Sequence, residues 1–192
     1  AVPVPNYPPV RLSQIEDHLR RQAGILVNAR VPVLITVPEA KPLARYLRSQ
    51  VRELNHVVTV DDLRQPPGDQ PWPLVKPSDM AFLQYTSGST GQPKGVMLTH
   101  ANLLANVRAM GLALKADSTD VFVSWLPLYH DMGLIGAWLG SMYHAVKLVV
   151  MSPLTFLARP ERWLWVIHEH RGSISAAPNF AYELCTHRIT DE

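Results

Sequence analysis

The sequence is almost without cysteine and has no marked excess of charge of either sign. Its one cysteine, Cys185, cannot form a disulfide within the chain, and a reducing cytoplasm is therefore the expected location. The formal net charge of +2 gives no reason to expect nucleic acid or an acidic membrane as a partner. The longest nearly apolar stretch, residues 132–146, contains glycines and His144 and falls short of a membrane span.

What is present is the composition of a globular protein. Of the 192 residues, 47% are hydrophobic and 18% are charged, which is enough apolar material for a sizeable core. The chain starts at Ala1 without a methionine, in a proline-rich run, and ends at Glu192 directly after an amphipathic segment. Because no helix stop signal precedes Glu192, the sequence predicts an internal fragment of a longer protein.

Apolar runs alternate with segments of helical periodicity along the chain. The runs predict strands at residues 32–37, 56–60, 80–85, 95–99, 121–126, 147–151 and 174–177. Helices are expected at residues 13–26, 39–51, 101–114, 161–170 and 179–188, with a further helix that ends near residue 144. Ser13 and Glu16 form a capping-box pattern at the first helix.

This alternation predicts an α/β fold of mostly parallel sheets with flanking helices. A break at residues 115–119 indicates two subdomain portions, at about residues 1–116 and 117–192. Apolar surface left exposed on such a fragment would favour self-association.

Residues 85–95, which read YTSGSTGQPKG, are the most informative segment. Glycine permits the positive φ angles of a tight loop, in which backbone N–H groups and hydroxyls converge on an anion. Lys94 adds a mobile positive charge, and a polyphosphate is the expected ligand. This is not the Walker pattern, because Pro93 precedes Lys94 and Gly95 follows it. The alternative is an ordinary polar surface turn between two strands.

Residues 86–95 resemble the phosphate-binding loop of the adenylate-forming, or AMP-binding, enzyme superfamily. The resemblance implies the fold of the N-terminal domain of these enzymes, which activate a carboxylate with ATP, release pyrophosphate and pass the acyl group to a thiol. It also implies that Thr86, Ser87, Gly88, Ser89, Thr90, Gly91 and Lys94 bind ATP. Lys94 is in addition expected to be catalytic, by offsetting charge on the departing pyrophosphate.

A second segment, residues 124–136 (SWLPLYHDMGLIG), follows a predicted strand, where α/β sheets place ligands. His130 lies there on a turn that Pro127 begins, among apolar residues, and a neutral imidazole can donate a hydrogen bond to a carboxylate oxygen. The neighbouring carboxylate of Asp131 can modulate this imidazole. The alternative is a structural histidine that caps the following helix.

The segment is similar to the aromatic–histidine motif of the fatty acyl-AMP ligase branch, within the broader acyl-CoA synthetase-like group. That resemblance implies that His130 is catalytic and that His130, Met132 and Gly133 bind the acyl substrate. It also makes residues 175–184 resemble a wall of the acyl tunnel, with Asn179 and Phe180 as candidate substrate contacts. A plain core strand and helix is the alternative for these two residues.

No metal site is expected in the chain itself. His168 and His170 lie two apart on a predicted helix, so their side chains point apart. The resemblance implies ATP and Mg as cofactors, but the Mg-contacting motif, the ribose-binding Asp and the catalytic Lys of the C-terminal domain match no stretch here. We therefore expect the C-terminal domain to lie outside this chain and the chain alone to be inactive.

The leading hypothesis is that the parent protein activates a fatty acid as its acyl-adenylate and transfers it to an acyl carrier protein or a polyketide or peptide synthase module. One alternative is transfer to coenzyme A. An alternative of another class is a phosphate-binding module without catalytic activity. Amino-acid activation is disfavoured, because those domains commonly carry an Asp where this chain has the His130 segment.

Overall fold

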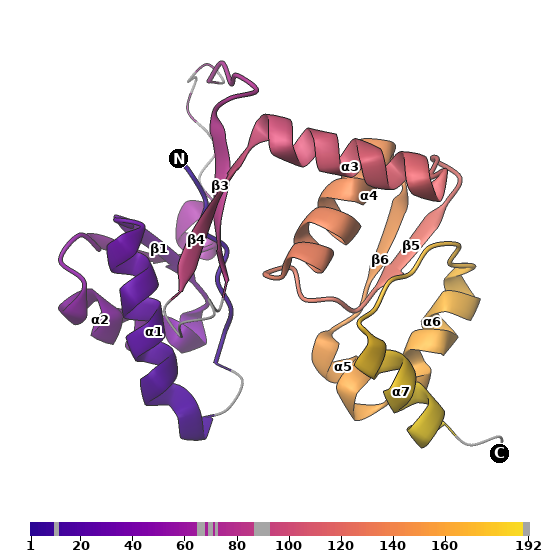
Figure 1. Ribbon diagram of the computed structural model, residues 1–192. Coiled ribbons are helices and arrows are strands. Elements are labelled where there is room, and N and C mark those ends of the chain that lie inside the picture. The colour runs from indigo at the N-terminus through magenta and orange to yellow at the C-terminus, as the bar shows by residue number, and fades with distance from the viewer. Residues whose placement is uncertain (10–11, 65–67, 69–70, 72, 87–92, 190–192) are drawn as a thin grey trace. The chain divides into compact units, whose positions relative to one another are not determined.

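The computed structural model describes residues 1–192 except 10–11, 65–67, 69–70, 72, 87–92 and 190–192 (Figure 1). The chain divides into two compact units, Ala1–His100 and Ala101–Glu192, which are described separately here. The division falls at the first turn of helix α3 (His100–Leu114), whereas the sequence analysis placed it after this helix. The helix joins the second unit because its buried residues Val107 and Gly111 contact His144 of that unit.

The first unit begins with a β-α-β arrangement, as predicted. A short 3-10 turn, η1 (Leu12–Gln14), leads into α1 (Ile15–Asn28), and β1 (Val33–Thr36) is followed by η2 (Pro38–Ala40), α2 (Lys41–Gln50), β2 (His56–Thr59) and η3 (Asp61–Leu63). Strands β1 and β2 pair in parallel. The core of this unit is formed by the buried side chains of Leu26, Val31, Leu47, Val51 and Leu54.

The capping box predicted at Ser13 is not formed at the start of α1. Ser13 lies within η1, and the N-cap residue is Gln14, which makes no side-chain capping hydrogen bond. The helix gains its stability from packing instead, because Ile25 and Leu26 on one of its faces are almost fully buried.

Strands β3 (Met80–Thr86) and β4 (Lys94–Thr99) form an antiparallel pair, visible as the long ribbon of the first unit in Figure 1. The sequence analysis predicted both strands but expected mostly parallel sheets. A connection this short leaves no room for the crossover that a parallel pair requires, so the two strands run in opposite directions.

The second unit contains α3, β5 (Val121–Ser124), η4 (Met132–Leu139), α4 (Gly140–His144), β6 (Lys147–Val150), α5 (Pro153–Ala158), α6 (Glu161–His170) and α7 (Asn179–Arg188). Strands β5 and β6 are parallel, and the strand predicted at residues 174–177 is reduced to a single parallel bridge between Phe122 and Ile174. The largest core cluster has Val123, Trp125, Leu126, Phe156, Trp163 and Ala181 at its centre.

The bounds of α6 and α7 agree with the prediction, and α5 was not foreseen. The helix predicted to end near residue 144 is present, but its first part, η4, is a π-helix. Together with the parallel pairs in both units, these elements confirm the α/β fold class.

Candidate functional site

Two residues of the expected ATP-binding segment lie opposite each other at the end of the β3–β4 pair where the chain connects the two strands. Thr86 is the last residue of β3 and pairs in register with Lys94, the first residue of β4. Ser87, Gly88, Ser89, Thr90 and Gly91 lie outside the described residues. The two strands therefore bring the two ends of the ATP-binding segment together, and they place Lys94 directly across from Thr86, which carries a hydroxyl group.

Packing of Tyr85 explains the glycine that follows Lys94. A Cβ atom at Gly95 would lie 2.9 Å from Cζ of the Tyr85 ring, so the ring crosses the strand where a side chain is absent. The Tyr85 hydroxyl donates a hydrogen bond to the side-chain carbonyl of Asn28 at the end of α1. Burial raises the pKa of Tyr85, which keeps this phenol protonated as a donor.

The ammonium group of Lys94 is available to a ligand. Within the described part of the chain, no carboxylate forms an ion pair with it, and the residue is exposed. A positive charge that is not neutralised by the protein can attract and bind a phosphate group.

His130 ends a turn that follows β5 in the second unit. Its backbone N–H donates to the Pro127 carbonyl oxygen at 3.1 Å, and its own carbonyl oxygen accepts from the Leu134 N–H at 2.8 Å. The imidazole is 63% exposed, and its Nδ1 lies 2.6 Å from Oδ1 of Asp131. Asp131 also caps η4, because the same oxygen accepts from the Met132 N–H at 2.7 Å.

This geometry fixes which ring nitrogen of His130 carries a proton. A carboxylate oxygen only accepts, so Nδ1 is the donor to Asp131. In a neutral ring Nε2 is then an acceptor, and it donates only when the ring is an imidazolium. Nε2 is therefore the ring nitrogen left to face a ligand, and the expected hydrogen bond from His130 to a substrate carboxylate stays a prediction.

The apolar neighbours of His130 shield it less than expected. Leu134 is buried, but Leu128 and Met132 are both more than one third exposed. Gly133 has a steric role, because a Cβ atom there would lie 2.2 Å from the Pro127 carbonyl oxygen. The glycine thus lets the first turn of η4 close tightly against the turn that carries His130.

Asn179 and Phe180 begin α7, and Phe180 adjoins a group of stacked aromatic rings. Trp125 lies parallel to Phe156 with 4.0 Å between ring centroids, and its edge contact with Phe180 has a centroid separation of 6.0 Å. Phe180 remains 49% exposed, and Asn179 is exposed.

No metal centre is assembled in the described part of the chain: no three His, Cys, Asp or Glu side chains there come close enough to hold an ion. In the same part, no helix is both long and apolar enough to cross a bilayer.

The family description "AMP-binding enzyme" matches residues 1–191. The chain belongs to this family. JamA of Moorena producens, a medium-chain-fatty-acid–[acyl-carrier-protein] ligase, is 36% identical over all of this AMP-binding chain and 33% of its own length. FadD26 of Mycobacterium marinum, a long-chain-fatty-acid–AMP ligase, is 38% identical over 96% of this chain and 33% of its own length.

A solved structure from a study of fatty acyl-adenylate ligases of E. coli and L. pneumophila has the same fold as this AMP-binding chain. Its TM-score is 0.92, at 36% identity over 99% of this chain and 34% of that one. The chain therefore spans about one third of the length of the relatives it matches.

Two contacts in the second unit had no signal in the sequence. Nε2 of His144 lies 3.2 Å from the Val107 carbonyl oxygen, and Nε of Arg108 donates to the Tyr143 hydroxyl at 2.7 Å. These pairs are separated by more than thirty positions, as the helices that carry them are joined by a strand and a long turn. Spacing along the chain cannot reveal such contacts, because they arise only when two helices pack.

Proposed function

We propose that the protein containing this chain is an ATP-dependent ligase that activates a fatty acid as its acyl-adenylate. The acyl group then passes to an acyl carrier protein or to a carrier module of a polyketide or peptide synthase. Similarity over nearly the whole chain to JamA, FadD26 and the fatty acyl-adenylate ligase structure carries this proposal.

Thr86, Ser87, Gly88, Ser89, Thr90, Gly91 and Lys94 are proposed to bind the β- and γ-phosphates of ATP. The pairing of Thr86 with Lys94 across β3 and β4 supports this assignment, because it brings the two ends of the segment to one place. Lys94 then offsets the negative charge that develops as the bond from the α-phosphorus to the pyrophosphate oxygen breaks.

His130 is proposed to orient the fatty carboxylate, with Met132 and Gly133 beside it and with Asn179 and Phe180 along the acyl chain. The carboxylate oxygen attacks the α-phosphorus directly and needs no general base. The contribution of the His130 imidazole is therefore alignment of that oxygen and balance of its charge. Asp131 supports this role by holding Nδ1, which leaves Nε2 for the substrate.

The remaining requirements of the reaction are assigned to parts of the protein outside this chain. We place the Mg ligand there, with the ion carried by ATP, and we place the C-terminal domain there as well. In this proposal residues 1–192 are an incomplete N-terminal adenylation domain that is inactive alone. The single cysteine favours a cytoplasmic location for the whole protein.

Pyrophosphate exchange on the whole protein tests the proposal. Labelled pyrophosphate should enter ATP when a medium- or long-chain fatty acid is added, and not when an amino acid is added instead. Holo-carrier protein should then accept the acyl group, while coenzyme A should not. If the acyl group passes only to coenzyme A, the acceptor in this proposal is wrong. If no pyrophosphate exchange occurs at all, the alternative of a phosphate-binding module without catalytic activity is favoured.

A further inference from the structure

The helix that begins beside His130 is held at both of its ends. Its first eight residues form the π-helix η4, and α4 continues it to His144. π-Helices of this length are rare, because their hydrogen-bonding pattern competes with the α-helical one. Tertiary contacts must therefore favour the π form in this segment.

At the N-terminal end these contacts come from Asp131 and Gly133. Asp131 caps the first N–H of η4 and simultaneously binds His130. Gly133 lies so close to the Pro127 carbonyl oxygen that any side chain would collide with it. A shift of this end would therefore move the His130–Asp131 pair with it.

At the C-terminal end the contact is between α4 and α3. The His144 ring occupies the place of a missing side chain at Gly111, where a Cβ atom would lie 2.1 Å from Nε2 and 2.3 Å from Cε1. The same Nε2 donates to the Val107 carbonyl oxygen at 3.2 Å, since a carbonyl only accepts. The imidazole is thus locked into a notch on α3.

A neighbouring pair strengthens this contact. Arg108 donates through Nε to the Tyr143 hydroxyl at 2.7 Å, and its guanidinium carbon lies 5.6 Å from the centroid of the Tyr143 ring. Two consecutive residues of α3 therefore hold two consecutive residues of α4. Such paired contacts fix rotation as well as distance between two helices.

The interface between these helices also contains room for movement. A cavity of about 30 Å³ lies between α3 and the η4–α4 helix, and Gly136, Gly140 and Ser141 line it. The Ser141 hydroxyl is buried there without a hydrogen-bond partner among the described residues. Because this cavity is also lined by Gly111 and His144, loss of the His144 contact would leave the helix less tightly held against α3.

We propose that Gly111 and His144 form a positioning pair that sets the register of the η4–α4 helix and, through it, the place of His130. The pair acts through His130 and does not touch the substrate. This inference rests on the proposed role of His130 in orienting the fatty carboxylate.

Gly111→Ala in the whole protein tests the pair directly, because the added methyl group displaces the His144 ring. A misplacement of about 1 Å can lower a rate about a hundredfold. We expect kcat/KM for the fatty acid to fall by about tenfold to a hundredfold, with KM for ATP unchanged. Gly24→Ala is the matched control, since Gly24 is also in a helix but no atom lies within 4 Å of its added Cβ.

Further substitutions at His144 distinguish a positioning role of the pair from a general effect on the stability of the protein. His144→Gln keeps an N–H donor for Val107 and should stay near wild-type activity, whereas His144→Ala should behave like Gly111→Ala. The double variant Gly111→Ala/His144→Ala removes the ring that the methyl group meets, so its loss should be no greater than that of His144→Ala alone.

NMR of the whole protein provides a readout that does not depend on catalysis. The His130 ring signals, assigned by their absence in His130→Gln, should shift in Gly111→Ala and not in Gly24→Ala. Unchanged His130 signals, or unchanged kcat/KM in an active protein, would overturn the inference. If the wild-type protein activates no fatty acid, the proposed function fails while the NMR comparison still decides whether the pair positions His130.

Discussion

At the scale of single residues, one carboxylate oxygen serves both the His130 ring and the start of η4. Oδ1 of Asp131 accepts from Nδ1 of His130 and from the backbone N–H of Met132. Asp131 therefore has two functions in the fold. It caps the start of η4, and by binding Nδ1 it leaves Nε2 as the ring nitrogen that can face a ligand.

His130→Ala tests whether this imidazole acts on substrate. A hydrogen bond to a charged group is worth about 1.5–3 kcal/mol, so acyl-adenylate formation by the whole protein should fall about tenfold to a hundredfold. Because the side chain is largely exposed, the melting temperature should hardly change. Parallel losses of activity and stability, or full activity, would make His130 a structural residue.

Lys94→Ala addresses the phosphate end of the reaction. Removal of one charge-assisted contact should cost about 1.5–3 kcal/mol, or about one to two orders of magnitude in pyrophosphate exchange. The apparent affinity for the fatty acid should stay the same, because the proposed acyl contacts are elsewhere. Lys115→Ala, which also removes an exposed lysine, is the control, and equal effects of both substitutions would contradict the assignment.

At the scale of elements, glycines serve two different purposes in η4. Gly133 is required by the close approach of the Pro127 carbonyl oxygen, whereas nothing lies within 4 Å of a Cβ built at Gly136. Packing therefore requires a glycine at position 133. At position 136 no steric contact requires one, and the glycine only makes the unfolded backbone more flexible.

Gly133→Ala should therefore lower stability, whereas Gly136→Ala should not. Overpacking at Gly133 should lower the free energy of unfolding by about 1–3 kcal/mol, because carbonyl and backbone must move apart. Alanine at Gly136 should be neutral or raise it by up to about 1 kcal/mol. Urea unfolding of the 192-residue chain measures both, and a larger loss at Gly136 than at Gly133 would contradict the η4 geometry.

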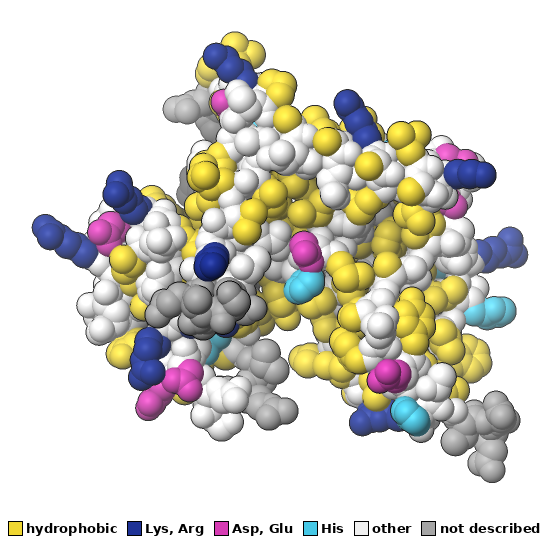
Figure 2. Space-filling view, in the orientation of Figure 1, with side chains coloured by type: hydrophobic (Ala, Val, Ile, Leu, Met, Phe, Trp, Pro, Cys, Tyr) yellow, Lys and Arg dark blue, Asp and Glu magenta, His cyan; other side chains and the backbone are white. Residues whose placement is uncertain are grey.

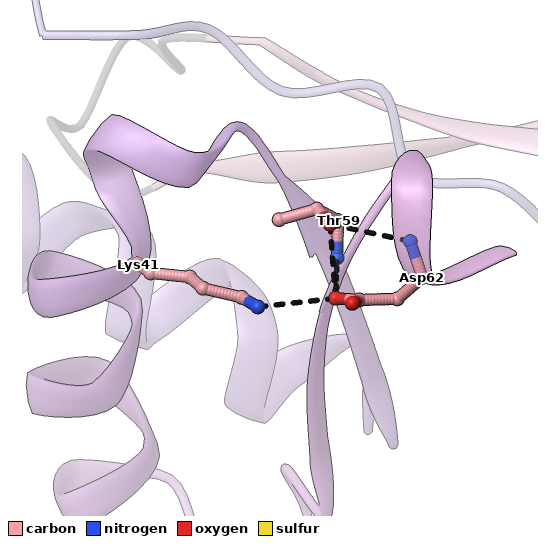
Figure 3. A network of polar contacts seen from close by, with 3 residues as sticks. All are labelled: Lys41, Thr59 and Asp62. Atoms are coloured by element: carbon pink, nitrogen blue, oxygen red, sulfur yellow. Dashed lines mark hydrogen bonds and ion pairs between the residues drawn. The ribbon is translucent and has the colours of Figure 1, made fainter.

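A polar network ties the end of β2 to α2 in the first unit. One carboxylate oxygen of Asp62 accepts from the Thr59 N–H at 2.8 Å, the Thr59 hydroxyl at 2.9 Å and the Lys41 ammonium at 3.1 Å (Figure 3). The hydrogen bonds from Thr59, assisted by Lys41, lower the pKa of Asp62 from its ordinary 3.8 to about 2.

This network predicts a pH-dependent contribution to stability. Because the pKa is lower in the folded state, Asp62 stabilises the fold above its unfolded pKa of 3.8, and the contribution disappears as pH falls towards about 2. Asp62→Ala should lower the melting temperature at pH 6. As the pH falls towards about 2, the melting temperatures of the variant and the wild type should become equal. Asp17→Ala, which removes a highly exposed ion pair, should show little effect at either pH.

At the scale of the whole molecule, large apolar side chains remain at the surface. Val33, Ile35 and Val37 around β1 are all exposed in the first unit, and Leu112 is 79% exposed in the second. Figure 2 shows hydrophobic side chains spread over the face in view. Parallel sheets are normally covered on both faces, so exposed apolar residues on β1 are unusual.

Self-association of the 192-residue chain should follow from this surface. We expect the mass measured by light scattering to rise with protein concentration, because association buries apolar side chains. Ile35→Glu should shift the population towards the monomer, while Asp17→Ala should not. A constant monomer mass at high concentration would contradict this prediction.

Much of the architecture could be read from residues close together in the sequence. The alternation of apolar runs and helical periods predicted the α/β class, and α6 and α7 were located to the residue, because helical periodicity and its ends are local properties. The candidate site residues around Lys94 and His130 were also proposed from their order in the chain, and their roles stay predictions.

Tertiary packing decided what local patterns could not. The antiparallel pairing of β3 with β4 depends on chain connection, the π form of η4 on contacts at both helix ends, and the His144–Gly111 contact on two helices meeting. The order of the residues predicted which side chains are candidates for chemistry, and the packing of distant segments decided how the helices and strands that carry them are held, because such contacts form only when the chain folds.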